Sequence, residues 1–250
     1  RSDVNPSKVG CSRTLCIDNK LIILWTSLET IVPKRKGQSI IREVVEGVLP
    51  FVGMQYFRRI FWRLATDLTR WNREYSLELL NGINADSEAD LSVKVFSLIA
   101  HKENSEQFNE LFGKVDDFEL LRYRLYSLGK VFEKPKRVVE TLNNHQRRVE
   151  WQLHRIYRAR NSVVHSGQSP GFTSVLVVNA HDYFDQVFEL SNELSSGPKG
   201  MRDYTSCFDY AEWLFKQYHV ELKRTTEFNI GNTSSVIWKR HDVLSKADFF

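Results

Sequence analysis

The sequence predicts an all-α fold, and three observations support this prediction. Apolar residues recur at spacings of three and four through most of the chain, which is typical of helices that bury one face. The 250 residues include only 12 glycines and 6 prolines, too few for a turn-rich β architecture. A hydrophobic fraction of 42%, with 16 Phe, 9 Tyr and 6 Trp, is enough to fill a core. This length suits one large domain or two small ones.

Composition indicates which partners and which cellular compartment suit the chain. The net charge of +4 is mildly basic, which suits an RNA-facing cleft as well as many proteins that bind no nucleic acid. Cys11, Cys16 and Cys207 lack the short paired spacing of zinc sites, so we expect reduced thiols and a cytoplasmic protein. No apolar run approaches the ~20 residues of a membrane span, and the start lacks a signal-peptide pattern. We therefore expect no membrane association.

The chain divides into three predicted parts. We expect an N-terminal arm or linker over residues 1–17, a helical bundle over 18–196 that includes a peripheral insertion at 73–116, and a C-terminal helical extension and tail over 197–250. Because the chain begins at Arg1 rather than Met, a sensing domain could precede it.

Helix signals place the elements within these parts. Asp18 is a good N-cap for a helix that runs to about Val32, and Pro33 follows it. A second helical pattern covers 38–72, and Pro50 and Gly53 are expected to break or kink it. The remaining predicted helices are 91–101, 107–112, 118–132, 135–165 with a kink near residues 143–144, 174–194 and 204–223; residues 225–250 have weak strand or coil character.

The helix end at residues 153–167 carries the most informative pattern. Arg160 falls within an apolar stripe, and a guanidinium that points at a core is costly unless it is paired or lines a cleft. Asn161 and His165 are four apart and share one helix edge, and Ser166-Gly167 is a plausible helix stop. The stripe consists of Val149, Leu153, Ile156, Tyr157, Val163 and Val164.

These residue types suit phosphodiester chemistry. Arginine binds phosphate in a bidentate way and stays charged, and histidine can act as a general base or acid near neutral pH. Asn161 could position a phosphate or the imidazole. The competing interpretation is structural: Arg160 forms a buried ion pair, and Asn161 and His165 serve as polar groups at a helix end. Glu29, on the flank of the first helix, is the first candidate to pair with Arg160, and the alternative is that it is a solvated helix carboxylate.

The same residues resemble a known superfamily. Residues 160–165 match the Arg-Asn-x3-His signature of the HEPN superfamily, and the longer run 155–167 looks most like its ApeA-like branch. Residues 24–29 resemble the first helix of these domains, and the loop and helix that follow Gly167 resemble their last bundle helix. Members are helical bundles that dimerise and bring two motifs together, and many are metal-independent ribonucleases of antiviral, toxin or stress systems.

The resemblance implies a function and a set of site residues. We expect a HEPN-like endoribonuclease that needs no metal or cofactor, that cleaves RNA by 2′-OH attack, and that forms the effector or toxin part of a bacterial antiviral defence system. A homodimer with paired motifs is expected, together with a sensor domain or partner protein. The expected catalytic residues are Arg160, Asn161 and His165, the supporting ones Glu29, Tyr157 and Ser166, and the RNA-binding ones Arg155 and Arg158.

Other functions stay open at this point. One alternative is a non-catalytic HEPN module for dimerisation or for binding a nucleotide or RNA. Another is a helical nucleic-acid-binding module, because residues 56–71 interleave arginines with aromatic residues. A metal-dependent nuclease is disfavoured, since no compact set of His and carboxylates has ligand spacing.

Overall fold

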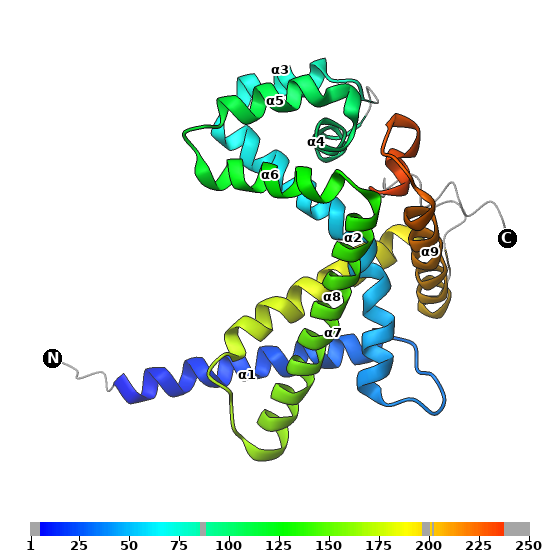
Figure 1. Cartoon of the computed structure of the whole chain (residues 1–250). Coiled ribbons are helices and arrows are strands. Elements are labelled where there is room, and N and C mark those ends of the chain that lie inside the picture. The colour runs from blue at the N-terminus through cyan, green and yellow to red at the C-terminus, as the bar shows by residue number, and fades with distance from the viewer. Residues whose placement is uncertain (1–5, 86–88, 197–200, 202, 238–250) are drawn as a thin grey trace. The chain divides into compact units, whose positions relative to one another are not determined.

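The computed structural model describes residues 6–85, 89–196, 201 and 203–237, and side chains in the first helix from residue 16 onward (Figure 1). Over these residues the regular elements are helical and none is a strand, which confirms the all-α prediction. No helix in the described part is both long and apolar enough to cross a membrane. The elements are α1 (Pro6–Ile31), α2 (Ile40–Trp71), α3 (Arg73–Gly82), α4 (Leu91–Ala100), η1 (Lys102–Asn104), α5 (Ser105–Lys114), α6 (Glu119–Phe132), α7 (Pro135–Ser166), α8 (Thr173–Ser196), α9 (Tyr204–Arg224) and η2 (Ile230–Ser235).

The chain forms two compact units that are discontinuous in sequence. Unit 1 takes its described residues from Arg1–Val52 and His145–Trp213, and unit 2 from Gly53–Asn144 and Leu214–Phe250. Helices α2, α7 and α9 each contribute residues to both units. This division differs from the expected arm, bundle and extension, because composition along the chain cannot reveal units that exchange segments within uninterrupted helices.

Helix α1 begins earlier than the sequence suggested. It starts at Pro6, a residue suited to the first turn of a helix, so the expected arm over residues 1–17 is already helical from that point. Asp18 is therefore not an N-cap. It is buried inside α1, and its carboxylate accepts a hydrogen bond of 2.6 Å from the Ser169 hydroxyl.

Helix α2 runs through the expected break. It continues across Pro50, because apolar residues on both sides of the proline are buried, among them Val48 and Phe51. Gly53 also lies within the helix, where a Cβ atom would overlap the Phe215 ring. The glycine therefore permits close packing. Of the break or kink expected at Pro50 and Gly53, the break is wrong.

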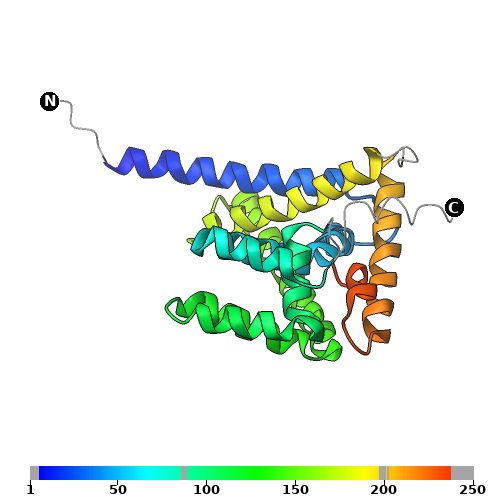
Figure 2. The same cartoon turned by 90° about the horizontal axis from the view of Figure 1, so that it is seen from above.

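Unit 1 is built around α1 and α8, which lie side by side in both views (Figures 1 and 2). Helix α7 adds its inner face to the same core, as its apolar stripe predicted. The buried side chains are Leu21, Trp25 and Leu28 of α1; Val149, Leu153 and Ile156 of α7; and Leu176, Ala180, Tyr183, Val187 and Leu190 of α8.

Unit 2 has an aromatic core to which α4 contributes directly. Helix α4 contacts α3, α5 and α6, and Figure 1 shows it end-on among them. Residues 73–116, expected as a peripheral insertion, lie within unit 2, where Val95 and Phe96 of α4 are fully buried. The rings of Phe57, Phe61, Phe96, Phe132 and Phe228 lie with centroids 5.1–6.1 Å apart.

The C-terminal part of unit 2 is helical as far as it is described. Tyr218 of α9 is buried, and its hydroxyl donates to the Val236 carbonyl at 3.0 Å. Burial raises the pKa of this phenol. The segment expected to be strand or coil contains the short helix η2. Residues 197–200, 202 and 238–250 of the expected extension and tail lie outside the described residues.

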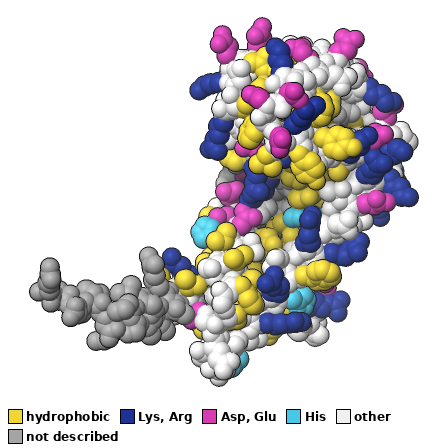
Figure 3. Space-filling view, turned by 60° about the vertical axis from the view of Figure 1, so that its left-hand side comes forward, with side chains coloured by type: hydrophobic (Ala, Val, Ile, Leu, Met, Phe, Trp, Pro, Cys, Tyr) yellow, Lys and Arg dark blue, Asp and Glu magenta, His cyan; other side chains and the backbone are white. Residues whose placement is uncertain are grey.

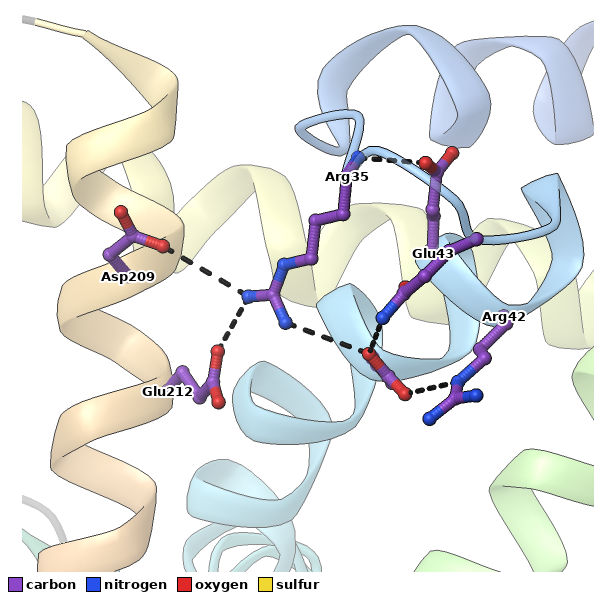
Figure 4. A network of polar contacts seen from close by, with 7 residues as sticks. Arg35, Arg42, Glu43, Asp209 and Glu212 are labelled. Carbon is purple, nitrogen blue, oxygen red and sulfur yellow. Dashed lines mark hydrogen bonds and ion pairs between the residues drawn. The ribbon is translucent and has the colours of Figure 1, made fainter.

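A polar network fixes the connection between α1 and α2 within unit 1 (Figure 4). The Arg35 guanidinium lies 2.6 Å from Glu212 and 4.0 Å from Asp209, both on α9, and 3.6 Å from Glu46 on α2. The backbone N–H of Arg35 also donates to Glu43 at 2.7 Å. The hydrogen bond to Glu212 raises the pKa of Arg35, partly offset by desolvation, so this cation is held by several carboxylates.

Candidate functional site

The C-terminal end of α7 is closed by local hydrogen bonds. The backbone N–H of Gly167 donates to the Val163 carbonyl at 3.0 Å, and Gly167 has a φ of 63°, which favours glycine. The Ser166 hydroxyl donates to the Ser162 carbonyl at 2.6 Å, and the Ser162 hydroxyl donates to the Gln168 carbonyl at 3.0 Å. The predicted helix stop is confirmed. Ser166, expected to support the site, bonds to the backbone and helps to end the helix.

Arg160 lies on the inner face of α7, as the apolar stripe predicted. Leu153 and Ile156 on that face are completely buried, and the Arg160 side chain is 23% exposed. The stripe ends just beyond, because Val164 is 46% exposed. Arg160 therefore sits where the buried face of α7 opens to solvent, a position from which a guanidinium can reach a ligand.

The contacts of Arg160 leave part of its donor capacity unused. Its Nη2 lies 3.9 Å from Oε2 of Glu29, so the predicted pairing of these two residues is confirmed at the long end of the ion-pair range. Its Nη1 donates to Oδ1 of Asn161 at 3.1 Å. Its Nε is buried and has no acceptor among the described residues. Leaving a buried donor unsatisfied costs about 1–3 kcal/mol.

Helix α1 supplies the wall of the site opposite Arg160. The indole Nε1 of Trp25 donates to Oε1 of Glu29, which leaves Oε2 directed at Arg160. The Trp25 ring is fully buried and lies 5.3 Å from the half-buried ring of Tyr157. Glu29 and Tyr157, both expected as supporting residues, thus come together through Trp25. The sequence reasoning gave Trp25 no role in the site, although its position four residues before Glu29 signals the contact.

His165 lies apart from Arg160 within one chain. Their separation of five positions corresponds to a rotation of about 140° around an α-helix, and the imidazole is exposed on the outer side of α7. No side chain of the described residues bonds to its ring. Asn161 lies between the two on the helix surface and contacts only Arg160 of the pair. One chain therefore assembles Arg160, Asn161 and Glu29 and presents His165 to solvent.

The two predicted RNA-binding arginines are exposed on α7. The Arg155 guanidinium lies over the ring of Phe172 at 5.0 Å and donates to the Gln152 side chain at 3.5 Å. Arg158 has no carboxylate partner among the described residues. Both cations are therefore accessible to an anionic ligand next to the motif.

Other groups of the chain do not join this site. His181 of α8 pairs with Asp185 at 2.8 Å. No group of three or more metal-ligating side chains gathers within the described part of the chain. A cavity of about 510 Å³ lies in unit 2 against Phe108, Phe112 and Tyr126 and contains none of the predicted site residues. Its lysines are engaged, Lys102 with Glu227 and Lys130 with Glu133, at 2.6 and 3.6 Å.

Comparisons with models of protein families, with curated proteins and with solved structures find no match to this chain.

Proposed function

We propose that this chain is a metal-independent endoribonuclease of the HEPN type. The observation that carries the proposal is the state of Arg160: a cation at the mouth of a buried face, 3.9 Å from one carboxylate, with its Nε buried and unsatisfied. A guanidinium that serves only the fold would be expected to have its donors filled. Arg160 instead retains donors for an oxyanion, and a histidine follows five residues later on the same helix.

The chemistry assigns a role to each motif residue. The His165 imidazole removes the proton of the ribose 2′-OH, whose oxygen attacks the adjacent phosphorus, while an acid protonates the departing 5′-oxygen. Arg160 stabilises the negative charge of the pentacoordinate phosphorus, and Asn161 positions the phosphate or the imidazole. The products are a 2′,3′-cyclic phosphate and a 5′-OH. DNA has no 2′-OH and should not be cut.

A second copy of the chain completes the proposed site. Arg160 and His165 diverge around one helix, so a single copy offers no position where both reach one phosphate. In a two-fold dimer with paired α7 ends, Arg160 of one copy could meet His165 of the other, and the second histidine could act as the acid. We infer a homodimer for this reason.

The resemblance extends the proposal to a biological setting. A cytoplasmic effector or toxin of a bacterial antiviral defence system, restrained by a sensor domain or partner protein, fits a ribonuclease of this type. The alternative function is RNA or nucleotide binding without cleavage by a dimeric HEPN module. It is favoured by one observation, the absence of any described side chain that orients the His165 ring.

Incubation with total RNA in a chelator tests cleavage directly. The expected result is cleavage by the wild type, with 2′,3′-cyclic phosphate ends, and its loss in His165→Ala and in Arg160→Ala. The matched control is His181→Ala, which removes an exposed histidine of α8 in the same unit. Unchanged cleavage by a folded His165→Ala protein would overturn the proposal, and binding without cleavage by the wild type would favour the alternative.

Mixing the two inactive variants tests the shared site. A heterodimer of His165→Ala and Arg160→Ala chains combines Arg160 from the first chain with His165 from the second but lacks the second histidine as acid. Random exchange should restore a measurable fraction of the wild-type activity, with about a quarter as the upper limit. If the two variants are folded and exchange subunits but the mixture stays inactive, Arg160 and His165 do not act across copies.

A further inference from the structure

The outer face of α7 carries an exposed tryptophan in line with the motif. Trp151 is 68% exposed, the highest value among the large apolar side chains that the structure describes. Arg155, Arg158 and His165 follow at four, seven and fourteen residues, spacings that keep them on one helical face. From Trp151 to His165 this face extends for roughly 21 Å, the length of a few nucleotides in an extended strand.

The same face has an excess of uncompensated positive charge. Between His145 and Ser166, α7 contains five arginines and one acidic residue, Glu150. Arg147 and Arg148 lie one turn before Trp151 and are exposed, as Arg155 and Arg158 are on its other side. None of these four guanidinium groups has a carboxylate within ion-pair distance in the described part of the chain. Figure 3 views one face of the molecule and shows Lys and Arg side chains interspersed with hydrophobic ones.

A second exposed ring lies beside the motif end of this face. Phe172, in the loop after α7, is 47% exposed and has the Arg155 guanidinium over its ring at 5.0 Å. Alternating cations and exposed rings are the features by which proteins hold single-stranded nucleic acid, through phosphate contacts and base stacking. Duplex RNA buries its bases and offers no ring to stack against.

We propose that the outer face of α7 binds single-stranded RNA, with Trp151 as the platform for one unpaired base and Arg147, Arg148, Arg155 and Arg158 as phosphate contacts. The inference rests on the proposed nuclease and specifies its substrate class. A strand whose scissile phosphate lies between Arg160 of one copy and His165 of the other continues from that His165 along α7 toward Trp151. The enzyme would therefore select unpaired segments a few nucleotides long and leave duplex RNA uncut.

Binding can be measured without cleavage. The probe is a fluorescently labelled 2′-O-methyl oligonucleotide of mixed sequence, which lacks the attacking hydroxyl, offered single-stranded and as a duplex. We expect the wild type to bind the single strand more tightly. Trp151→Ala should weaken this binding by roughly tenfold, while Trp151→Phe, which keeps a ring, should retain most of it. The control is Tyr123→Ala, because Tyr123 is 66% exposed but lies on α6 in unit 2.

Salt dependence tests the arginines separately. Each of Arg147→Ala and Arg148→Ala should make the slope of log affinity against log salt shallower by about 0.7, the effect of one lost phosphate contact on a single strand. Arg73→Ala, at an exposed position of α3 in unit 2, should leave the slope unchanged.

The outcomes separate this inference from the proposed function. Cleavage of unmodified RNA, with affinity and KM unaffected by Trp151→Ala, would overturn the binding face and leave the nuclease intact. RNA binding that depends on Trp151, without any cleavage, would support the RNA-binding role of the outer face of α7 and count against the proposed nuclease activity. Equal affinity for duplex and single strand, or loss of dimerisation in Trp151→Ala with unchanged RNA affinity, would overturn the assignment of this face to unpaired RNA.

Discussion

Two arginines of unit 1 have opposite surroundings. Arg35 has Glu212 at 2.6 Å, Glu46 at 3.6 Å and Asp209 at 4.0 Å, and its backbone is bound by Glu43 (Figure 4). Arg160 has one carboxylate, Glu29, at 3.9 Å. Arg35 is the more exposed of the two, at 39% against 23% of the side chain. The more buried cation is thus the less compensated one.

This difference separates a structural role from a binding role. A partly exposed guanidinium with several carboxylates has little attraction left for an anion, and its network joins α1, α2 and α9 within unit 1. A more buried guanidinium with an unsatisfied Nε and a single carboxylate at 3.9 Å is costly for the fold, and an oxyanion bound at its exposed part would supply the missing counter-charge. The comparison predicts that removing each arginine will affect a different property.

The largest expected effect is on cleavage by Arg160→Ala. Loss of a cation that stabilises the charged transition state should lower kcat by about 100- to 1000-fold. Arg35→Ala should leave cleavage near the wild-type level and lower the free energy of unfolding by about 1 kcal/mol, since its ion pairs are partly exposed. Single-turnover cleavage and urea unfolding of both variants provide the two measurements. Equal loss of activity in both variants would mean that Arg35 and Arg160 do not differ as a structural and a binding residue.

The carboxylate partners should differ in the same way. Glu29→Gln removes the charge that holds Arg160 in place, so we expect kcat to fall by about tenfold. KM should not rise, because the substrate phosphate loses a repelling neighbour. Glu212→Gln, which weakens the closest partner of Arg35, is the matched control and should affect unfolding alone. A rise in KM without a change in kcat for Glu29→Gln would mean that Glu29 contacts the substrate instead of positioning Arg160.

Each arginine is also followed by a glycine with positive φ, Gly37 at 83° and Gly167 at 63°. An alanine at either position has open space but a strained backbone, at a cost of about 1–2 kcal/mol. Gly37→Ala should lower stability only. Gly167→Ala should lower stability and also cleavage, because it loosens the helix end that presents His165. Gly171→Ala, in the same loop as Gly167 with open space and no positive φ, is the control for thermal unfolding and activity.

Much of this comparison could be read from the sequence. Arg160 interrupts an apolar stripe and Glu29 flanks another, which made them candidates to pair, and the structure supplies the contact between the two helices. Helix ends marked by Pro33 and by Ser166-Gly167 were also correct, because their signals are local.

Non-local contacts account for what could not be predicted. Asp18 resembled an N-cap, but its partner Ser169 is 151 residues away. Pro50 resembled a break, but burial on both sides carries α2 through it. The carboxylates around Arg35 come from two helices, and no spacing in the chain indicates that Glu212 lies beside Arg35. The unsatisfied Nε of Arg160 likewise depends on the packing of α1 against α7.

The smallest expected effect is the loss, in acid, of the stability that Glu46 contributes through the Arg35 network. The hydrogen bond from Arg42 lowers the pKa of Glu46 below its ordinary value of 4.5, although burial opposes this shift. A carboxylate with a lowered folded-state pKa contributes stability that is present above the ordinary value and lost as the pH falls through the folded value. At neutral pH, Glu46→Gln should therefore reduce the free energy of unfolding by about 0.2–0.5 kcal/mol, the range for an i,i+4 ion pair. The difference should vanish in acid, as measured by urea unfolding from pH 7 to pH 3 with Glu189→Gln on α8 as the control. A difference that persists at pH 3 would mean that Glu46 stabilises unit 1 through packing instead of charge, and the contrast with Arg160 would then rest on Glu212 and Asp209 alone.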